Sequence, residues 1–252
     1  MRGRVAIAAP LALLIAACAT GPRPAPQVRT ATPDERALVA RVLTPLLIAL
    51  EYSLDRTMEA LRLKDGCLIG LGVLVSDRLN AAVGPGRTTP CAPFQLLVTD
   101  AALKTLPEPD LQAMLAHELG HVHLGHFAQA AVRQRQQESG EAGPDRTEHE
   151  PPGDRETTTD SVTMTSPEIA KRALKREDEA EADQFAAALL RRVGGERGFE
   201  RCLALAHLFD RLEARSHTRP AEWLATHPLP GRRADATRAD CEAGGLALPR
   251  ER

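Results

Sequence analysis

The chain has 252 residues, enough for one domain with a full core or at most two small ones. Its 32 basic and 34 acidic side chains nearly cancel, so the charge gives no reason to expect a nucleic-acid partner. Only 3% of the residues are aromatic, and we therefore expect a core built mainly of Leu, Ala and Val.

Residues 1–17 have the pattern of a secretory signal, with Arg2 and Arg4 at the start and an apolar run after them. The run is shorter than the ~20 residues that span a bilayer, so we do not expect a permanent membrane-spanning anchor. The small residues before Cys18 resemble a bacterial lipobox. This resemblance implies a lipid on Cys18, and Ala19 implies transfer to the outer membrane with the domain facing the periplasm. The alternative is a plain secretory signal with an incidental cysteine.

The composition then divides the chain into a tether and a domain. Residues 18–32 are rich in Pro, and we interpret them as an extended tether. Residues 33–252 are expected to form one domain. Within it, residues 136–166 are almost entirely polar, which predicts a disordered insertion because such a segment buries too little apolar surface to become ordered. The insertion is either a mobile lid over a site or a plain linker.

The first part of the domain predicts a helix followed by a small sheet. Thr32 and Pro33 are a strong helix start, and the helical spacing of apolar residues continues to about Leu63. Short apolar runs at residues 68–75 and 94–99 predict strands, with a turn-rich stretch between them. We expect a two- or three-stranded antiparallel sheet, which either binds an extended peptide at its edge or is purely structural.

Residues 110–127 contain the pattern HExxH in almost entirely apolar surroundings. On a helix, His117 and His121 lie on one face and can bind a single metal ion, and Glu118 is placed to take a proton from water. Gly120 costs about 1 kcal/mol relative to alanine in a helix interior, and such local costs are typical of functional sites. The alternative is an ordinary helix with buried histidines, so a third ligand is needed to decide.

A candidate third ligand lies in the helix predicted from Ser166 to about Arg192. Glu179 and Asp183 are four residues apart, and the same stripe continues into apolar positions, which directs both carboxylates inward. Glu179 can then complete a site of two histidines and one glutamate, and Asp183 can orient a ligand imidazole. Glu181 is expected to point away from this site.

The remaining chain predicts a helix over residues 198–215 and a short helix toward Cys241. Besides Cys18, the chain has an even number of cysteines, which suits disulfides in an oxidising compartment. Four cysteines allow three pairings, and we favour those that close local loops. The favoured pairs are Cys67–Cys91 and Cys202–Cys241.

Together these motifs resemble the zinc metallopeptidase family typified by HtpX, BepA and the CAAX prenyl protease. The resemblance covers residues 70–240 and rests on the HExxH pattern and on the acidic pattern from Glu179 to Asp183. Three further features agree with it: a strand-like segment at residues 80–86, His126 nine residues after the first histidine, and a C-terminal His-Pro segment with His227 and Arg233.

The resemblance implies an α+β fold, a mostly helical zincin-like domain with a small antiparallel sheet beside the HExxH helix. It implies one Zn²⁺ per chain, bound by His117, His121 and Glu179, with Glu118 and Asp183 in catalytic roles. His227 is either a regulatory or fourth ligand or a turn residue. Arg233 either stabilises the oxyanion or pairs with a buried carboxylate. The other histidines are expected not to be ligands: His123, His149, His207 and His217.

The implied activity is an endopeptidase that cleaves misfolded or misassembled periplasmic or outer-membrane proteins. Membrane-spanning helices like those of HtpX, and helical repeats like those of BepA, are not predicted here. The alternative function is therefore an envelope assembly or chaperone-like zinc protein with little or latent proteolysis. The expected partners are a polypeptide substrate, the outer membrane through the lipid, and envelope assembly machinery.

Overall fold

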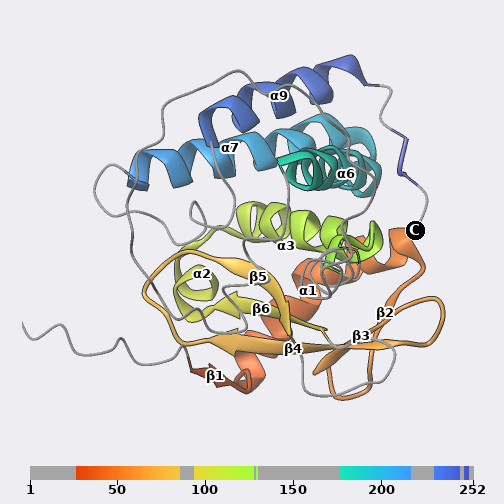
Figure 1. Ribbon diagram of the computed structural model, residues 1–252, viewed down its shortest axis with the longest axis vertical. Coiled ribbons are helices and arrows are strands. Elements are labelled where there is room, and N and C mark those ends of the chain that lie inside the picture. Colours follow the sequence, from red (N-terminus) through yellow and green to blue (C-terminus); the bar gives the residue numbers. More distant parts are fainter. Residues whose placement is uncertain are drawn as a thin grey trace, which may run out of the picture.

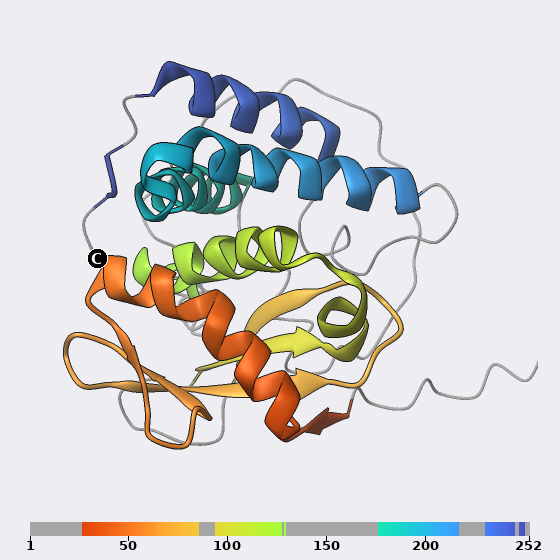
Figure 2. The ribbon, with the colours of Figure 1, turned by 180° about the vertical axis from the view of Figure 1, so that it is seen from behind.

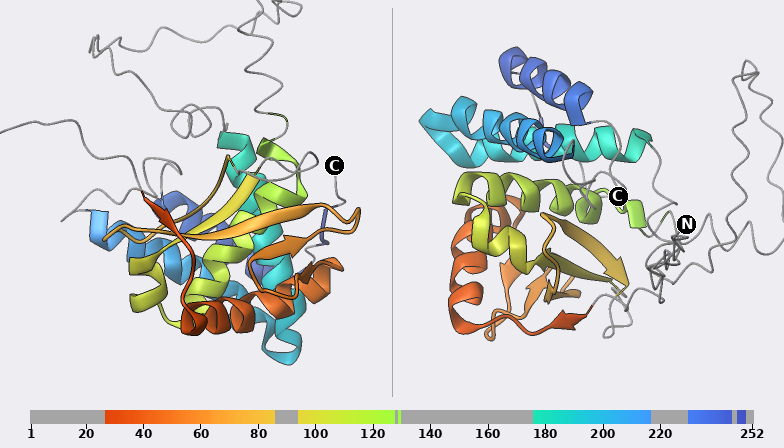
Figure 3. Two further views of the ribbon diagram at one scale, coloured as in Figure 1. Left: turned by 90° about the horizontal axis from the view of Figure 1, so that it is seen from below. Right: turned by 90° about the vertical axis from the view of Figure 1, so that its left-hand side faces the viewer.

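The computed structural model describes residues 27–85, 94–127, 129, 176–216, 230–244 and 247–249. These residues form layers: a sheet at one side, helix α3 above it, and helices α6, α7 and α9 stacked above α3 (Figure 1). Figure 3 shows the same stacking from the side. The expected signal segment and the insertion at 136–166 lie outside the described residues.

The elements follow one another along the chain in this order: β1 (Val28–Arg29), α1 (Pro33–Leu50), β2 (Ser53–Leu54), β3 (Ala60–Arg62), β4 (Leu68–Leu74), β5 (Ala81–Pro85), β6 (Phe94–Thr99), α2 (Asp100–Thr105), α3 (Glu108–His123), α6 (Arg176–Gly194), the 3₁₀ turn η1 (Gly195–Arg197), α7 (Gly198–Ser216) and α9 (Pro230–Ala243).

Helix α1 begins where the sequence predicts it. Thr32 caps it, with its hydroxyl accepting from the backbone N–H of Glu35 while the Glu35 carboxylate accepts from the backbone N–H of Thr32. The predicted extension to Leu63 is wrong, because α1 ends at Leu50. Glu51 adopts a left-handed conformation (φ 59°), and its N–H bonds back to the last turn, so the chain reverses into β2 and β3.

The sheet has the strand order β2-β3-β4-β6-β5 in the described residues, with β1 also paired to β4. The two predicted strands are confirmed as β4 and β6, but they pair in parallel, and the sheet is mixed with six strands rather than two or three. Residues 81–85, which are turn-rich by composition, form strand β5, as the resemblance implied, and this strand pairs antiparallel with β6. Strand β1 also brings Val28 and Arg29 into the domain, although both fall in the expected tether.

Helix α3 is the centre of the molecule, and every residue from Asp110 to His121 is buried. It contacts β5 and α1 on one side and α6 and α7 on the other. From behind, α1 runs across the sheet below α3 (Figure 2). This position explains the apolar surroundings of HExxH and confirms the predicted fold class: α+β, mostly helical and zincin-like, with a sheet beside the HExxH helix. None of the described helices is long and apolar enough to cross a membrane.

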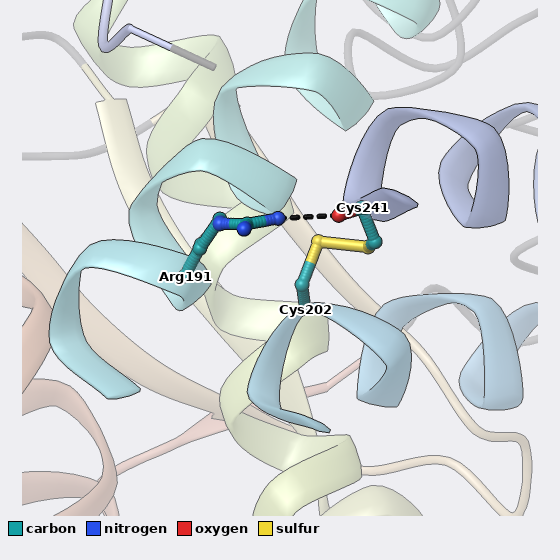
Figure 4. Close-up of a disulfide and its surroundings, with 3 residues drawn as sticks. All are labelled: Arg191, Cys202 and Cys241. Atoms are coloured by element: carbon teal, nitrogen blue, oxygen red, sulfur yellow. Dashed lines mark hydrogen bonds between the residues drawn. A yellow bond between two sulfur atoms is a disulfide. The ribbon is translucent and has the colours of Figure 1, made fainter. Parts of the chain in front are cut away.

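A disulfide joins Cys202 in α7 to Cys241 in α9, as predicted (Figure 4). The Arg191 guanidinium of α6 donates to the carbonyl of Cys241, so three helices meet at this point. Cys67 is also disulfide-bonded, and its partner lies outside the described residues, as does Cys91.

Candidate metal centre

Helix α3 presents His117 and His121 to the space beneath α6. The two side chains lie one helical turn apart, and their Nε2 atoms are 3.1 Å from each other. Their rings meet edge to face, with centroids 4.7 Å apart. Both residues are at most 1% exposed, so their nitrogens face each other deep in the protein.

Helix α6 places the Glu179 carboxylate over the same point. Oε2 of Glu179 lies 3.5 Å from Nε2 of His117, and Oε1 lies 3.4 Å from Nε2 of His121. One donor atom from each of the three buried residues lies within 4.8 Å of the others. The structure therefore assembles the predicted ligand set from two helices more than fifty positions apart in the sequence.

The chemistry of this donor set fits a metal ion. Two imidazole nitrogens and one carboxylate are a set that zinc uses in catalytic sites, where a fourth position stays open for water. Converging polar groups in a buried position are costly unless something pairs with them. Burial alone favours the neutral imidazole, but the hydrogen bonds to Asp183 and Glu179 outweigh it and raise the pKa of His117 to about 9. A proton thus competes for the place that a cation would take.

Asp183 binds the first histidine, His117, through its Nδ1 atom, and Arg233 binds Asp183 in turn. Oδ1 of Asp183 lies 2.8 Å from Nδ1 of His117, the ring nitrogen that points away from Glu179. Arg233 from α9 donates to both oxygens of Asp183, at 2.6 Å each, and stacks 4.4 Å above the ring of Phe209. Burial favours the protonated acid, but the charge of Arg233 and the contact with His117 keep the pKa of Asp183 below its usual value.

The contacts of Arg233 agree with one of its two predicted roles. Its guanidinium binds the Asp183 carboxylate side-on and lies 3.5 Å from Oε2 of Glu179. Arg233 therefore pairs with buried carboxylates and orients them, as the second interpretation expects.

Glu118 lies on α3 beside the ligands and reaches the sheet. The backbone N–H of Val83 in β5 donates to Oε2 of Glu118 at 3.0 Å. Burial raises the pKa of Glu118 to about 8; His117 opposes this rise and Glu179 adds to it. Glu118 is thus a buried carboxyl whose proton affinity lies near neutral pH, as suits a general acid or base.

The close packing of α3 against α6 explains why residue 120, inside the metal helix, is a glycine. A Cβ atom at this position would lie 3.1 Å from the backbone Cα and carbonyl oxygen of Ala182 in α6. Glycine lets α3 and α6 approach this closely without displacing the backbone of Ala182, and the approach brings Glu179 to the two histidines. The helix penalty of Gly120 is therefore linked to the geometry of the site.

Glu181 lies outside the donor set, but its side chain is not simply solvated. Its Oε2 lies 3.3 Å from Nε2 of His126, and Nδ1 of His126 lies 2.9 Å from Nδ1 of His121. Helical spacing had predicted a solvated side chain, because residues two positions apart on a helix face different directions. The long glutamate side chain instead reaches sideways to a histidine that follows the end of α3.

The remaining histidines lie outside the donor set or outside the described residues. His123 is buried, with Nδ1 3.0 Å from the Tyr52 hydroxyl and Nε2 3.1 Å from the Pro249 carbonyl oxygen, which fixes the C-terminal segment to α3. His207 lies on the exposed side of α7. Three others fall outside the described residues: His149, His217 and His227.

Two histidines and a glutamate around one point, with a second glutamate beside them on the HExxH helix, define a metallopeptidase site. The chain as a whole agrees with the site. Residues 70–240 match the model of Peptidase family M48, and the chain belongs to this family of metal-dependent peptidases. The comparison with individual curated proteins gives no match.

Proposed function

We propose that this metallopeptidase is a zinc-dependent endopeptidase acting on misfolded or misassembled polypeptides of the bacterial cell envelope. The observation that carries the proposal is the convergence of His117, His121 and Glu179 at one buried point with Glu118 beside them. A structural zinc site closes all four positions with protein ligands, whereas the arrangement found in the described residues, three ligands with an adjacent carboxylate, is typical of catalytic zinc.

The ion and the protein divide the chemistry between them. When bound by the three ligands, zinc would polarise a peptide carbonyl and favour ionisation of a nearby water and of Glu118. Glu118 takes the proton of the attacking water and delivers it to the leaving amine, acting first as a base and then as an acid. Its position beside the ligands suits both steps, because burial raises the pKa of its carboxyl above the usual value and so favours uptake of a proton.

Asp183 and Arg233 keep His117 in its productive orientation. The Asp183 carboxylate accepts from Nδ1 of His117, so Nε2, the nitrogen nearer Glu179, is the one that would bind the ion. Arg233 holds both oxygens of Asp183, so this carboxylate stays ionised and fixed inside the protein. A hydrogen-bond partner of this kind fixes the tautomer of a metal-binding histidine.

Strand β5 supports a polypeptide as the substrate. It is the last strand in the described sheet order, and it touches α3 at the residue that would act on the substrate. An extended peptide can add to such an edge through main-chain hydrogen bonds. These bonds require neither a particular sequence nor a free terminus of the peptide. This mode suits internal peptide bonds of unfolded chains.

The substitution Glu118→Gln tests the proposal. We expect the variant to keep its fold and its zinc but to lose cleavage of a denatured, fluorescently labelled polypeptide by a factor of about 10²–10⁴. Glu108→Gln is the matched control, because Glu108 is an exposed glutamate of the same helix. Full cleavage by Glu118→Gln, or no cleavage by the wild type, would show that the proposal is wrong.

A second experiment separates proteolysis from an assembly role. A strain lacking the gene is complemented with the wild type or with Glu118→Gln, and growth under envelope stress is measured. An endopeptidase requires Glu118 for complementation. Complete rescue by Glu118→Gln would favour the chaperone-like alternative.

The location in the envelope is proposed from the N-terminal sequence. Small residues before Cys18 and Ala19 after it support a lipidated cysteine and an outer-membrane anchor facing the periplasm. Cells grown with a fatty-acid analogue should label the wild type but not Cys18→Ala. A Cys18→Ala chain that still carries label and stays with the membrane would contradict this location.

A further inference from the structure

The Nδ1 atoms of the two metal-binding histidines have different partners. His117 is supported by the buried Asp183, whereas Nδ1 of His121 lies 2.9 Å from another histidine, His126. Nε2 of His126 in turn lies 3.3 Å from Oε2 of Glu181. Glu181 and His126 thus form a two-residue connection from the protein surface to a ligand of the metal.

The connection exists because the chain turns sharply after α3. Five positions along a continuous helix would place His126 on a different face from His121. Gly125 instead adopts a left-handed conformation (φ 67°), and its N–H bonds back to the carbonyl of Val122. This turn returns the fully buried His126 to the ring of His121, with the two centroids 5.0 Å apart.

The positions of the ring protons follow from the geometry. With Nε2 of His121 given to a metal ion, its proton lies on Nδ1 and is donated to Nδ1 of His126. Nδ1 of His126 is then an acceptor, so the proton of this ring lies on Nε2 and is donated to Glu181. Each donor in the series meets one acceptor, and the carboxylate at its end fixes the direction.

We propose that His126 and Glu181 are positioning residues that hold His121 in the orientation and tautomer required to bind the metal. The proposal rests on the metal centre of the proposed function and adds a second support to it. Helix α6 then serves the site three times: Glu179 binds the metal, Asp183 orients His117, and Glu181 orients His121 through His126.

The two supports differ in exposure, which predicts the size of their effects. The side chain of Glu181 is 40% exposed, whereas that of Asp183 is 10% exposed. Water can replace an exposed acceptor at little cost. Removing Glu181 should therefore weaken the support of His121 in part, and removing His126 should remove it entirely.

The test measures zinc affinity of the full-length chain by competition with a chromophoric chelator, without any substrate. We expect His126→Leu to lower the affinity by about 10- to 100-fold, the usual cost of losing the partner of a ligand. His126→Gln should retain most of the affinity, because its amide offers one acceptor and one donor. Glu181→Ala should cost about tenfold or less, since water can take its place.

Glu177→Ala is the matched control, because Glu177 is an exposed glutamate on the same helix. It should leave the affinity unchanged. Unfolding of the metal-free variants, followed by circular dichroism, shows whether each variant is folded. If His126→Leu does not fold, His126→Gln and Glu181→Ala still decide the question.

Two further measurements distinguish positioning from general structural support. In the double variant His126→Leu/Glu181→Ala, the loss should equal that of His126→Leu alone, because Glu181 acts through His126. In the zinc-loaded wild type, ¹⁵N NMR should show a protonated Nδ1 on His121 whose proton exchanges slowly, and His126→Leu should accelerate this exchange. Unchanged affinity in His126→Leu, additive losses in the double variant, or unchanged exchange would each overturn the proposal. Because no peptide is cleaved in these assays, they remain informative even if the chain proves not to be an endopeptidase.

Discussion

The helices above the sheet and the layer formed by the sheet and α1 share one apolar core but differ in their polar and covalent contacts. The helical layer, α3 with α6, α7 and α9, contains the buried pair Asp183–Arg233, the buried Glu179 and the disulfide between α7 and α9. In the layer of the sheet and α1, apolar side chains from α1, β4 and β6 form the core. An ion pair there, such as Arg29–Glu35, remains partly exposed.

This difference shows where function has a cost in stability. Buried charges need partners, and those partners must themselves be held in place. The helical layer has both the metal ligands and the ion pair, with the covalent link beside them. The sheet supports α3 from below, and in the proposed function β5 is the strand to which a substrate would add. Substitutions in the helical layer should therefore change metal binding and stability together, and those near α1 should change stability alone.

Removal of a ligand should have the largest effect. Glu179→Ala leaves two histidines, which do not complete a zinc site, so we expect the purified protein to contain little or no zinc. Metal analysis by mass spectrometry measures this directly, with Glu177→Ala as the control on the same helix. A full equivalent of zinc in Glu179→Ala would show that Glu179 is not a ligand.

Loss of the buried cation should be the next largest effect. Arg233→Leu leaves Asp183 charged and buried, and we expect a loss of about 3–5 kcal/mol in the free energy of unfolding. Urea unfolding measures it, and Arg238→Leu is the control, because Arg238 lies on the same helix at the surface. The double variant Arg233→Leu/Asp183→Asn should recover part of the loss. A double variant less stable than Arg233→Leu would contradict this explanation.

The disulfide should contribute a smaller amount. The variant Cys202→Ala/Cys241→Ala opens a loop with a sequence separation of 39, which corresponds to about 3–4 kcal/mol of unfolding free energy. Because α9 also holds Arg233, we expect weaker zinc binding as well. Urea unfolding and chelator competition test both effects. Unchanged stability would mean that the α7–α9 contacts alone determine the position of α9.

The smallest effect is expected beside α1, and it should depend on pH. The hydrogen bonds from Arg29 outweigh burial and lower the pKa of Glu35 to about 2. The carboxylate therefore contributes stability above its unfolded pKa of about 4.3, and this contribution is lost as the pH falls from there toward 2. Glu35→Gln should cost about 1 kcal/mol at pH 7 and progressively less in acid, with zinc content unchanged. A constant difference between pH 7 and pH 3 would contradict this origin.

Much of this arrangement could be predicted from local sequence rules. The cap at Thr32 and the helical spacing around His117 depend on neighbours in the chain, and both are present in the structure. The inward direction of Glu179 followed from the apolar residues Ala186 and Leu190, about two and three turns later. The unfavourable glycine at position 120 also indicated a functional site in this helix. Its contact with Ala182 of another helix could not be predicted from the sequence.

The rest depended on contacts between distant segments. Strand β5 contains Gly84 and Pro85, which are poor strand residues by composition, so only the resemblance suggested a strand there; in the structure it pairs with β6 and bonds to Glu118 of α3. Strands β2 and β3 are two and three residues long, too short for an alternating pattern. The contact of Glu181 with His126 depends on the turn at Gly125. A left-handed conformation could be suspected there because the residue is a glycine, but the sequence did not show that this turn brings His126 back to His121.

The close approach of α3 and α6 at Gly120 affects the geometry of the metal site. Two ligands come from α3 and one from α6, so the separation of these helices determines the diameter of the space that an ion must fill. Natural sites discriminate among metals by such geometry more than by raw affinity. A methyl group at residue 120 would force the backbone of Ala182 outward by a few tenths of an ångström. The absence of a side chain at Gly120 thus sets the distance between the two histidines on α3 and Glu179 on α6.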